Sequence, residues 1–258
     1  MNENSVIAKK KFGQNFLKDE TVLQKIVEAM PNNSNKIVEI GPGLGDLTKY
    51  LVDVKSVEAF EVDTDLCKLL QKKFDKEIAT KQLHVNCGDV LEAWQSSLVD
   101  EDYDLVANLP YYIATNIILK ALADPKCKNI LVMVQLEVAE KFCATEGEKV
   151  FGSLGVITQS VGEAHIVVQV PPTAFEPPPK IDSAVFLIEK GSDRSDENFE
   201  GMLRVAFKQP RKTLMKNLSM TYDKEMLQEV FKELEFIQTI RPHQVSTSDY
   251  HQLYNKIK

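Results

Sequence analysis

Short apolar runs and longer segments of helical periodicity alternate along the chain from Lys36 onward. Runs of four to eight apolar residues fit strands buried in a parallel sheet, and apolar residues repeated every three or four positions fit helices that cover such a sheet. The expected strands lie at 36–40, 57–62, 83–86, 103–107 and 130–134, with helices capped by Asp65 and running from Thr115 to Ala123. This alternation predicts an α/β fold with a parallel sheet.

The pattern changes near residue 165. Segments 165–170 and 183–189 again look like strands, but a proline-rich stretch joins them where a helix would be needed for a parallel connection. The two strands are therefore expected to form an antiparallel pair. The predicted sheet then has seven strands.

A polar segment, GSDRSDE at 191–197, marks the expected boundary between two domains. Beyond it, apolar residues repeat at helical spacing in one stripe along 226–234 and in another along 250–257. We therefore predict a first domain at 1–190 and a small helical domain at 191–258.

A glycine-rich turn, EIGPGLG at 39–45, follows the first expected strand and precedes a helix. Glycine allows a tight turn and lets a ligand approach the backbone closely, and here Gly41 and Gly43 would serve that purpose. Such a turn alone is a weak signal, because many glycine-rich turns bind nothing.

Carboxylates at the ends of successive expected strands sharpen the interpretation. Glu61 lies 20 residues after Gly41, where an acid can hold ribose hydroxyls, and Asp89 follows the third strand, where it could accept from an adenine amine. Glu39, before the turn, would lie beside the cationic end of the ligand. This pattern favours S-adenosylmethionine, with its ammonium and sulfonium groups, over a pyrophosphate cofactor. The alternative is that these acids only cap helices.

The tetrapeptide Asn108-Leu109-Pro110-Tyr111 follows the fourth expected strand. The exocyclic nitrogen of adenine is a poor nucleophile because its lone pair is delocalised into the ring. An amide oxygen from Asn108 and the carbonyl of Leu109 or Pro110 could accept its two N–H groups and free that lone pair. Proline fixes its own φ, and Tyr111 could stack on the base. The tetrapeptide thus predicts methyl transfer to adenine N6.

The formal net charge of −7 argues against nucleic-acid binding by the whole surface, because phosphate attraction needs Lys and Arg. Two local basic segments remain candidates, AKKK at 8–11 and the acid-free stretch 203–216, although both could be ordinary solvated surface. The expected RNA-binding residues are Lys9, Lys10, Lys11, Lys180, Arg204, Lys208, Arg211 and Lys212.

Several features place the chain in the cytoplasm. No apolar run approaches the roughly 20 residues that cross a bilayer, and the first residues lack the apolar region of a secretory signal. The four cysteines show no metal-binding spacing and are expected to be free thiols. No metal site is expected, and a monomer is the default.

Several motifs in one order resemble the rRNA adenine N6-dimethyltransferases, and within them the bacterial enzymes that act on small-subunit (16S) rRNA. The motifs are KKFGQNFL at 10–17, the glycine turn, Glu61, Gly88-Asp89, Asn108–Tyr111, PPxxFxPxPK at 171–180, DSAV at 182–185 and AFKQPRKTL at 206–214. The resemblance implies the Rossmann-like, seven-stranded sheet of class I methyltransferases, with a small C-terminal helical domain.

The resemblance also implies roles. Asn15 and Leu17 would join the glycine turn, the acids and Asn108 around S-adenosylmethionine, which leaves as S-adenosylhomocysteine. Tyr111 and Phe175 would sandwich the target adenine. The implied substrate is a pair of adjacent adenosines in the 3′-terminal hairpin loop of 16S rRNA within immature 30S subunits, each dimethylated during ribosome biogenesis.

Two alternatives remain from the sequence. A resistance-type enzyme that methylates 23S rRNA shares the fold and the Asn-x-Pro-Tyr loop, although KKFGQNFL and PPPKIDSAVF favour the small-subunit type. A non-catalytic RNA- or DNA-binding assembly or transcription factor on the same fold would have no need of Asn108, Pro110 and Tyr111. A nicotinamide dehydrogenase is more distant, because it has no use for the third acid or the tetrapeptide.

Overall fold

The computed structural model describes residues 15–191 and 196–258, and its contacts divide the chain into two compact units. The first unit contains the residues up to Ala139 together with His165–Lys190, and the second contains Glu140–Ala164 together with Gly191–Lys258. The chain thus changes unit at residue 190, where the sequence placed the domain boundary. Residues 140–164, which the sequence assigned to the first domain, group with the C-terminal residues instead.

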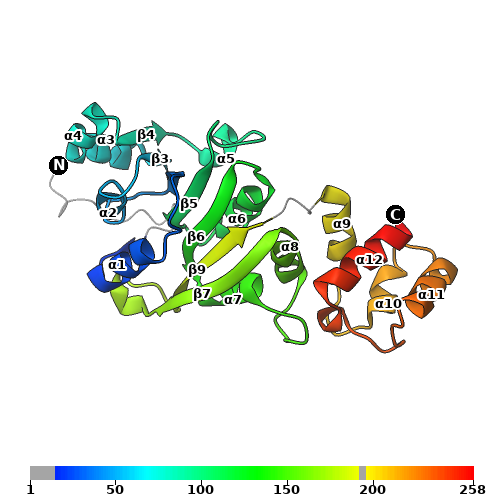
Figure 1. Ribbon diagram of the computed structural model, residues 1–258. Coiled ribbons are helices and arrows are strands. Elements are labelled where there is room, and N and C mark those ends of the chain that lie inside the picture. Colours follow the sequence, from blue (N-terminus) through cyan, green and yellow to red (C-terminus); the bar gives the residue numbers. More distant parts are fainter. Residues whose placement is uncertain (1–14, 192–195) are drawn as a thin grey trace. The chain divides into compact units, whose positions relative to one another are not determined.

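The described residues form one seven-stranded sheet in the order β4-β3-β2-β5-β6-β9-β7 (Figure 1). Its strands are β2 (Lys36–Ile40), β3 (Val57–Glu61), β4 (Leu83–Cys87), β5 (Tyr103–Asn108), β6 (Cys127–Gln135), β7 (Gly162–Val170) and β9 (Ser183–Lys190). Strands β2 to β6 pair in parallel, whereas β9 pairs antiparallel with β6. The prediction of a seven-stranded, mainly parallel α/β sheet is confirmed.

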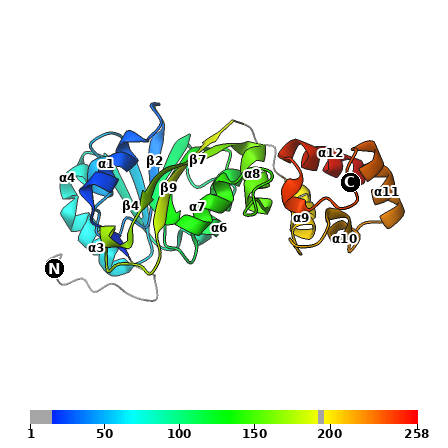
Figure 2. The ribbon, with the colours of Figure 1, turned by 90° about the horizontal axis from the view of Figure 1, so that it is seen from below.

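Helices lie on both sides of the sheet, with α3 and α4 on one side of the strands and α6 and α7 on the other (Figure 2). The helices up to residue 143 are α1 (Glu20–Glu28), α2 (Thr48–Leu51), α3 (Thr64–Lys73), α4 (Asp75–Ala79), α5 (Val90–Ala93), α6 (Ala114–Ala123) and α7 (Leu136–Cys143). A short antiparallel pair, β1 (Phe16–Leu17) with β8 (Phe175–Glu176), lies apart from the main sheet. Buried strands such as β5 explain the continuous apolar runs in the sequence, since both faces are covered.

Helix α3 begins earlier than the sequence indicated. The expected cap was Asp65, but the side chain of Asp63 accepts a hydrogen bond from the backbone N–H of Asp65 and so caps the helix. An Asp at the N-cap satisfies one of the backbone donors that every helix start leaves unpaired.

The second unit is helical. It contains α8 (Ser153–Val161), α9 (Glu197–Ala206), α10 (Leu214–Leu218), α11 (Lys224–Glu233) and α12 (Thr247–Ile257). Helix α8 contacts α9 and α12, and its Ser160 Oγ lies 2.8 Å from His251 Nε2, which explains why residues 140–164 group here. Leu227 of the first expected stripe and Leu253 of the second are fully buried.

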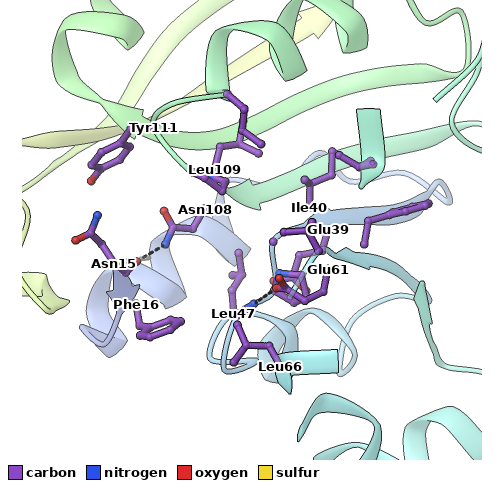
Figure 3. A pocket seen from close by; sticks show the side chains of 18 of the residues that line it. Asn15, Phe16, Glu39, Ile40, Leu47, Glu61, Leu66, Asn108, Leu109 and Tyr111 are labelled. Carbon is purple, nitrogen blue, oxygen red and sulfur yellow. Dashed lines mark hydrogen bonds between the residues drawn. The ribbon is translucent and has the colours of Figure 1, made fainter. Parts of the chain in front are cut away.

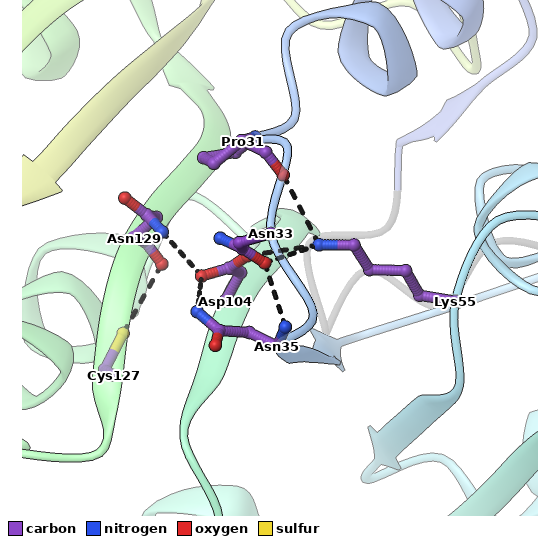
Figure 4. Close-up of polar contacts among 7 residues, drawn as sticks. All are labelled: Pro31, Asn33, Asn35, Lys55, Asp104, Cys127 and Asn129. Carbon is purple, nitrogen blue, oxygen red and sulfur yellow. Dashed lines mark hydrogen bonds and ion pairs between the residues drawn. The ribbon is translucent and has the colours of Figure 1, made fainter.

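A buried polar cluster ties together the amino ends of four strands (Figure 4). Asp104 is 2% exposed, and its Oδ1 accepts from Asn35 Nδ2 at 3.0 Å and Asn129 Nδ2 at 2.6 Å. Lys55 Nζ lies 3.5 Å from the other carboxylate oxygen and donates to Asn33 Oδ1 at 2.7 Å. Such partners offset the free-energy cost of burying a carboxylate. The cluster fixes the end of the sheet opposite the glycine turn.

The expectation of four free thiols is wrong for one pair. Cys67 in α3 and Cys87 at the end of β4 form a disulfide, with their Cα atoms 6.0 Å apart. Cys127 and Cys143 are free. The pairing follows from the fold, because α3 packs beside the strand that comes after it.

Candidate active site

The carboxyl ends of β2, β3, β4 and β5 surround one cavity in the first unit (Figure 3). In open parallel sheets, ligands bind at this edge, beyond the strand ends. All the residues that the sequence assigned to the cofactor or to catalysis line this cavity, namely Asn15, Leu17, Glu39, Gly41, Gly43, Glu61, Asp89, Asn108, Leu109, Pro110 and Tyr111. Side chains more than 90 residues apart in the chain thus share one wall.

The glycine turn takes backbone conformations that favour glycine. Gly41 has a φ of 71° and Gly43 a φ of 59°, both in the left-handed region. A Cβ on Gly41 would lie 3.6 Å from Pro110 Cδ, so the turn lies next to the tetrapeptide. The cofactor side and the reaction side of the predicted site are therefore neighbours.

Glu61, at the end of β3, is 4% exposed and holds the turn in place. Its Oε2 accepts from Gly43 N at 3.1 Å, and its Oε1 accepts from Asp63 N at 2.9 Å. Burial raises the pKa of Glu61, while these backbone hydrogen bonds lower it. The carboxylate is thus positioned by the backbone on both sides and faces the cavity.

Glu39, at 1% exposure, is the most deeply buried acid of the cavity wall. Burial raises its pKa to about 8, although the hydrogen bond from Thr48 Oγ1 at 2.7 Å lowers it and the nearby Glu61 raises it further. The raised pKa favours the protonated form of Glu39 more than solvent does. A cationic group bound beside Glu39 would favour its ionised form.

Asp89 caps a helix and also lines the cavity, so it is compatible with both roles that the sequence allowed, a helix cap and a ligand contact. Its Oδ1 accepts from Leu91 N at 2.8 Å, so Asp89 caps α5, and the residue is exposed and lines the cavity. Capping fixes the side chain at the cavity rim, where the sequence placed the contact with an adenine amine.

The Asn108 side chain is oriented by a hydrogen bond with a distant part of the chain. Its Nδ2 donates to the main-chain oxygen of Asn15 at 3.2 Å (Figure 3). With the nitrogen directed at that carbonyl, Oδ1 is left to accept from a ligand. The following backbone is also fixed, because Leu109 N donates to Met133 O at 3.1 Å and Ile113 N donates to Pro110 O at 3.2 Å.

The ring of Tyr111 is held at the cavity by its hydroxyl, which lies 2.7 Å from Ser183 Oγ in β9. Burial raises the pKa of Tyr111 and the Ser183 hydrogen bond lowers it. Phe175 is placed differently. It is 5% exposed, belongs to the buried hydrophobic core and pairs with Leu17 across β8 and β1, and it does not line the cavity. Its role in an adenine sandwich stays a prediction.

Tyr112 also lines the cavity, although sequence reasoning assigned it no role. The side chain is 59% exposed. Its pKa is raised by partial burial first, then by the carboxylates of Asp89 and Glu61. Its position directly after the tetrapeptide could have indicated that Tyr112 lies at the cavity.

The basic residues predicted to bind RNA are distributed over both units. Lys9, Lys10 and Lys11 lie outside the described residues. Lys180 is exposed in the first unit, and exposed positions in the second unit are held by Arg204, Lys208, Arg211 and Lys212. Arg204 forms an ion pair with Glu200 one helical turn earlier, at 3.8 Å.

Within 15–191 and 196–258, no group of three or more His, Cys, Asp or Glu side chains could hold a metal ion. None of the helices in the same ranges has the length and apolar character required to cross a lipid bilayer.

Relatives with known names cover nearly the whole chain. The chain is 82% identical to the ribosomal RNA small subunit methyltransferase A of Sulfurimonas denitrificans, over 96% of this chain and 93% of the relative. It is 53% identical to the protein of the same name from Aliarcobacter butzleri, over 98% and 97% of the two chains.

Solved structures show the same fold. A dimethyladenosine transferase from Plasmodium falciparum superposes with a TM-score of 0.81 at 25% identity, over 92% of this chain and 95% of that one. The 23S rRNA methyltransferase ErmE superposes with a TM-score of 0.72 at 24% identity, over 94% and 99%. The fold is that of methyltransferases, as the sequence predicted.

The model of the ribosomal RNA adenine dimethylase family matches residues 6–258. That range includes the glycine turn, the strand-end carboxylates and the Asn108–Tyr111 loop, which the structure brings to one cavity. The chain belongs to the ribosomal RNA adenine dimethylase family.

Proposed function

We propose that the chain transfers methyl groups from S-adenosylmethionine to N6 of two adjacent adenosines in the 3′-terminal hairpin loop of 16S rRNA, within immature 30S subunits. The observation that carries the proposal is the Asn108 amide, fixed by Asn15 at the edge of the cavity that the glycine turn completes. The small subunit is chosen because the relatives at 82% and 53% identity are named for it.

The cavity fits S-adenosylmethionine by the chemistry of its walls. Glu61 would hold the ribose hydroxyls and Asp89 the adenine amine, while the turn at Gly41 and Gly43 lets the chain of the methionine pass close to the backbone. Glu39 would lie beside the cationic methionine end. When bound, this cofactor supplies an electrophilic methyl group.

Two acceptors would activate the adenine amine. Asn108 Oδ1 accepts one N–H, and the Leu109 carbonyl accepts the other. We favour Leu109 over Pro110 because the Pro110 carbonyl already accepts from Ile113 N. With both N–H bonds directed at acceptors, the nitrogen lone pair is turned toward the glycine turn. Positioning of this kind supplies most of the rate in such a reaction.

Tyr111 would stack on the target base, with its ring held by Ser183. The base must leave its stack to reach the cavity.

The two predicted domains would have different roles. Residues 1–190 would bind the cofactor and catalyse the reaction. The small helical domain at 191–258 would bind rRNA through Arg204, Lys208, Arg211 and Lys212. Lys180 and the lysines at 9–11 would add contacts to phosphate. The enzyme would act in the cytoplasm as a monomer and without a metal.

The test is transfer of tritiated methyl groups to immature 30S particles, with the product nucleoside identified by mass. We expect N6,N6-dimethyladenosine in 16S rRNA. Parallel reactions with 23S rRNA separate the proposal from a resistance-type activity, and labelling confined to 23S rRNA would overturn the choice of substrate.

A matched variant tests the enzyme itself. Asn108→Ala should abolish labelling but leave binding to the 30S particle largely intact, because it removes the amide that activates the reacting amine and keeps the basic residues proposed to contact rRNA. Full activity in the variant would overturn the mechanism. Binding without any labelling by the wild-type chain would instead support a non-catalytic assembly factor.

A further inference from the structure

Two neighbouring tyrosines of the loop after β5 both line the cavity. Tyr111 reaches Ser183 in β9, which lies two strands away from β5 across β6. Tyr112 lines the cavity together with Glu61 at the end of β3 and Asp89 after β4, which lie on the other side of β5 beyond β2. The two rings are thus placed differently, since the Tyr111 hydroxyl is tied to β9 and the Tyr112 side chain is exposed at the cavity.

Tyr112 is also a large side chain that is exposed at the cavity. Its side chain is 59% exposed, and Val62, which also lines the cavity, is 40% exposed. Large apolar and aromatic surfaces that remain exposed around a cavity gain free energy when a flat ligand covers them. Partial burial raises the pKa of the Tyr112 hydroxyl, and the carboxylates of Asp89 and Glu61 raise it further.

We propose that Tyr112 covers the adenosine half of the cofactor cavity, so that its ring packs against the bound adenosine moiety and sets the affinity for the cofactor and its demethylated product. This inference rests on the proposed function, because it takes S-adenosylmethionine as the ligand. It assigns the two tyrosines different ligands, with Tyr111 for the target base and Tyr112 for the cofactor.

The proposed contact with the adenosine moiety is made by the Tyr112 ring, so the variants either keep the ring or remove it. Tyr112→Phe keeps the ring and should bind S-adenosylhomocysteine as the wild type does. Tyr112→Ala removes it and should weaken binding about tenfold, the order expected for one aromatic stacking contact. Ile237→Ala is the matched control, because it removes a side chain of similar exposure from the second unit and should change nothing.

A ligand series then locates the contact. Titration calorimetry on the full chain should show that Tyr112→Ala weakens binding of S-adenosylhomocysteine and of methylthioadenosine, which lacks the amino-acid end, by the same factor. Tyr111→Ala should leave both affinities within about twofold of the wild type. In this proposal Tyr111 contacts the target base and not the cofactor, so the two tyrosines act independently. Unfolding midpoints of all variants, which we expect to agree, show that each is folded.

Equal affinities of the wild type and Tyr112→Ala for both ligands would overturn the inference while leaving the proposed function intact. A raised KM for rRNA with unchanged ligand affinity would also overturn it, and would place Tyr112 against the RNA. Failure of the wild type to bind S-adenosylhomocysteine at all would overturn the proposed function and this inference with it.

Discussion

The Asn108 side chain and the Asn15 main chain are joined by one hydrogen bond, from Nδ2 to the carbonyl oxygen at 3.2 Å. This contact links the end of β5 to the residue just before β1, 93 positions earlier in the chain. An amide has a donor end and an acceptor end, so a fixed donor also fixes the direction of the acceptor. The acceptor is the atom on which the proposed activation of adenine depends.

Asn108→Asp tests that orientation. The aspartate has nearly the same shape, but an oxygen would replace the donor and face the Asn15 carbonyl oxygen, which repels it. We expect the rate of methyl transfer to fall about 10²–10³-fold, as for loss of one positioned polar group in an active site. Single-turnover labelling measures the rate, and S-adenosylhomocysteine titration serves as the control for folding. A rate within tenfold of the wild type would contradict the assigned direction.

The hydroxyl of Tyr111 gives a second prediction, because it lies 2.7 Å from Ser183 Oγ. Tyr111→Phe and Ser183→Ala each break this one contact and keep the ring, so each should lower kcat/KM only a few-fold, the order of one neutral hydrogen bond. The double variant should have a kcat/KM similar to that of either single variant, because each substitution removes the same hydrogen bond. Fully additive effects on kcat/KM would show that the hydroxyls act independently.

The sequence predicted most of the cavity because parallel strands present their carboxyl ends at one edge. Once the glycine turn, Glu61, Asp89 and Asn108 were each placed at a strand end, the fold itself brought them together. The Cys67–Cys87 disulfide was missed because it depends on how α3 packs beside β4, which no local spacing records. The grouping of residues 140–164 with the second unit also depends on packing, through the contacts of α8 with α9 and α12.

The predicted role of Phe175 in an adenine sandwich can be tested against its observed burial. Its ring is 5% exposed within the hydrophobic core. Phe175→Ala should therefore lower the free energy of unfolding by about 3–5 kcal/mol, as buried Phe-to-Ala changes do. Urea unfolding measures this change. A stability like that of the wild type, together with a large loss of methyl transfer, would favour the adenine sandwich instead.

The raised pKa of Glu39 leads to a prediction of how the free energy of unfolding depends on pH. Its pKa in the folded chain is raised to about 8 from an ordinary value of 4.5, so between these values the folded state holds a proton that the unfolded state has released. The contribution of Glu39 to the free energy of unfolding therefore falls as pH rises through this window, by at most about 1.4 kcal/mol per pH unit. Glu39→Gln removes the titrating group and with it this slope.

Urea unfolding at several values between pH 5 and pH 8 tests the prediction. The stability of Glu39→Gln relative to the wild type should increase steadily across the window, because Gln keeps the contact with Thr48 but carries no charge. Parallel stability profiles would show that Glu39 ionises in the folded chain as it does in solvent.

Gly45 of the glycine turn offers a last test, because Gly147 has a similar φ but different surroundings. Gly45 has a φ of 80°, and a Cβ there would lie 2.5 Å from Phe74 Cε2 in the core. Gly147 has a φ of 89°, and nothing lies within 4 Å of its Cβ position. Gly45→Ala should therefore cost about 1–3 kcal/mol of overpacking beyond the backbone strain that Gly147→Ala shares. Urea unfolding of both variants measures the difference, and equal stabilities would mean that the Phe74 ring moves aside at no cost.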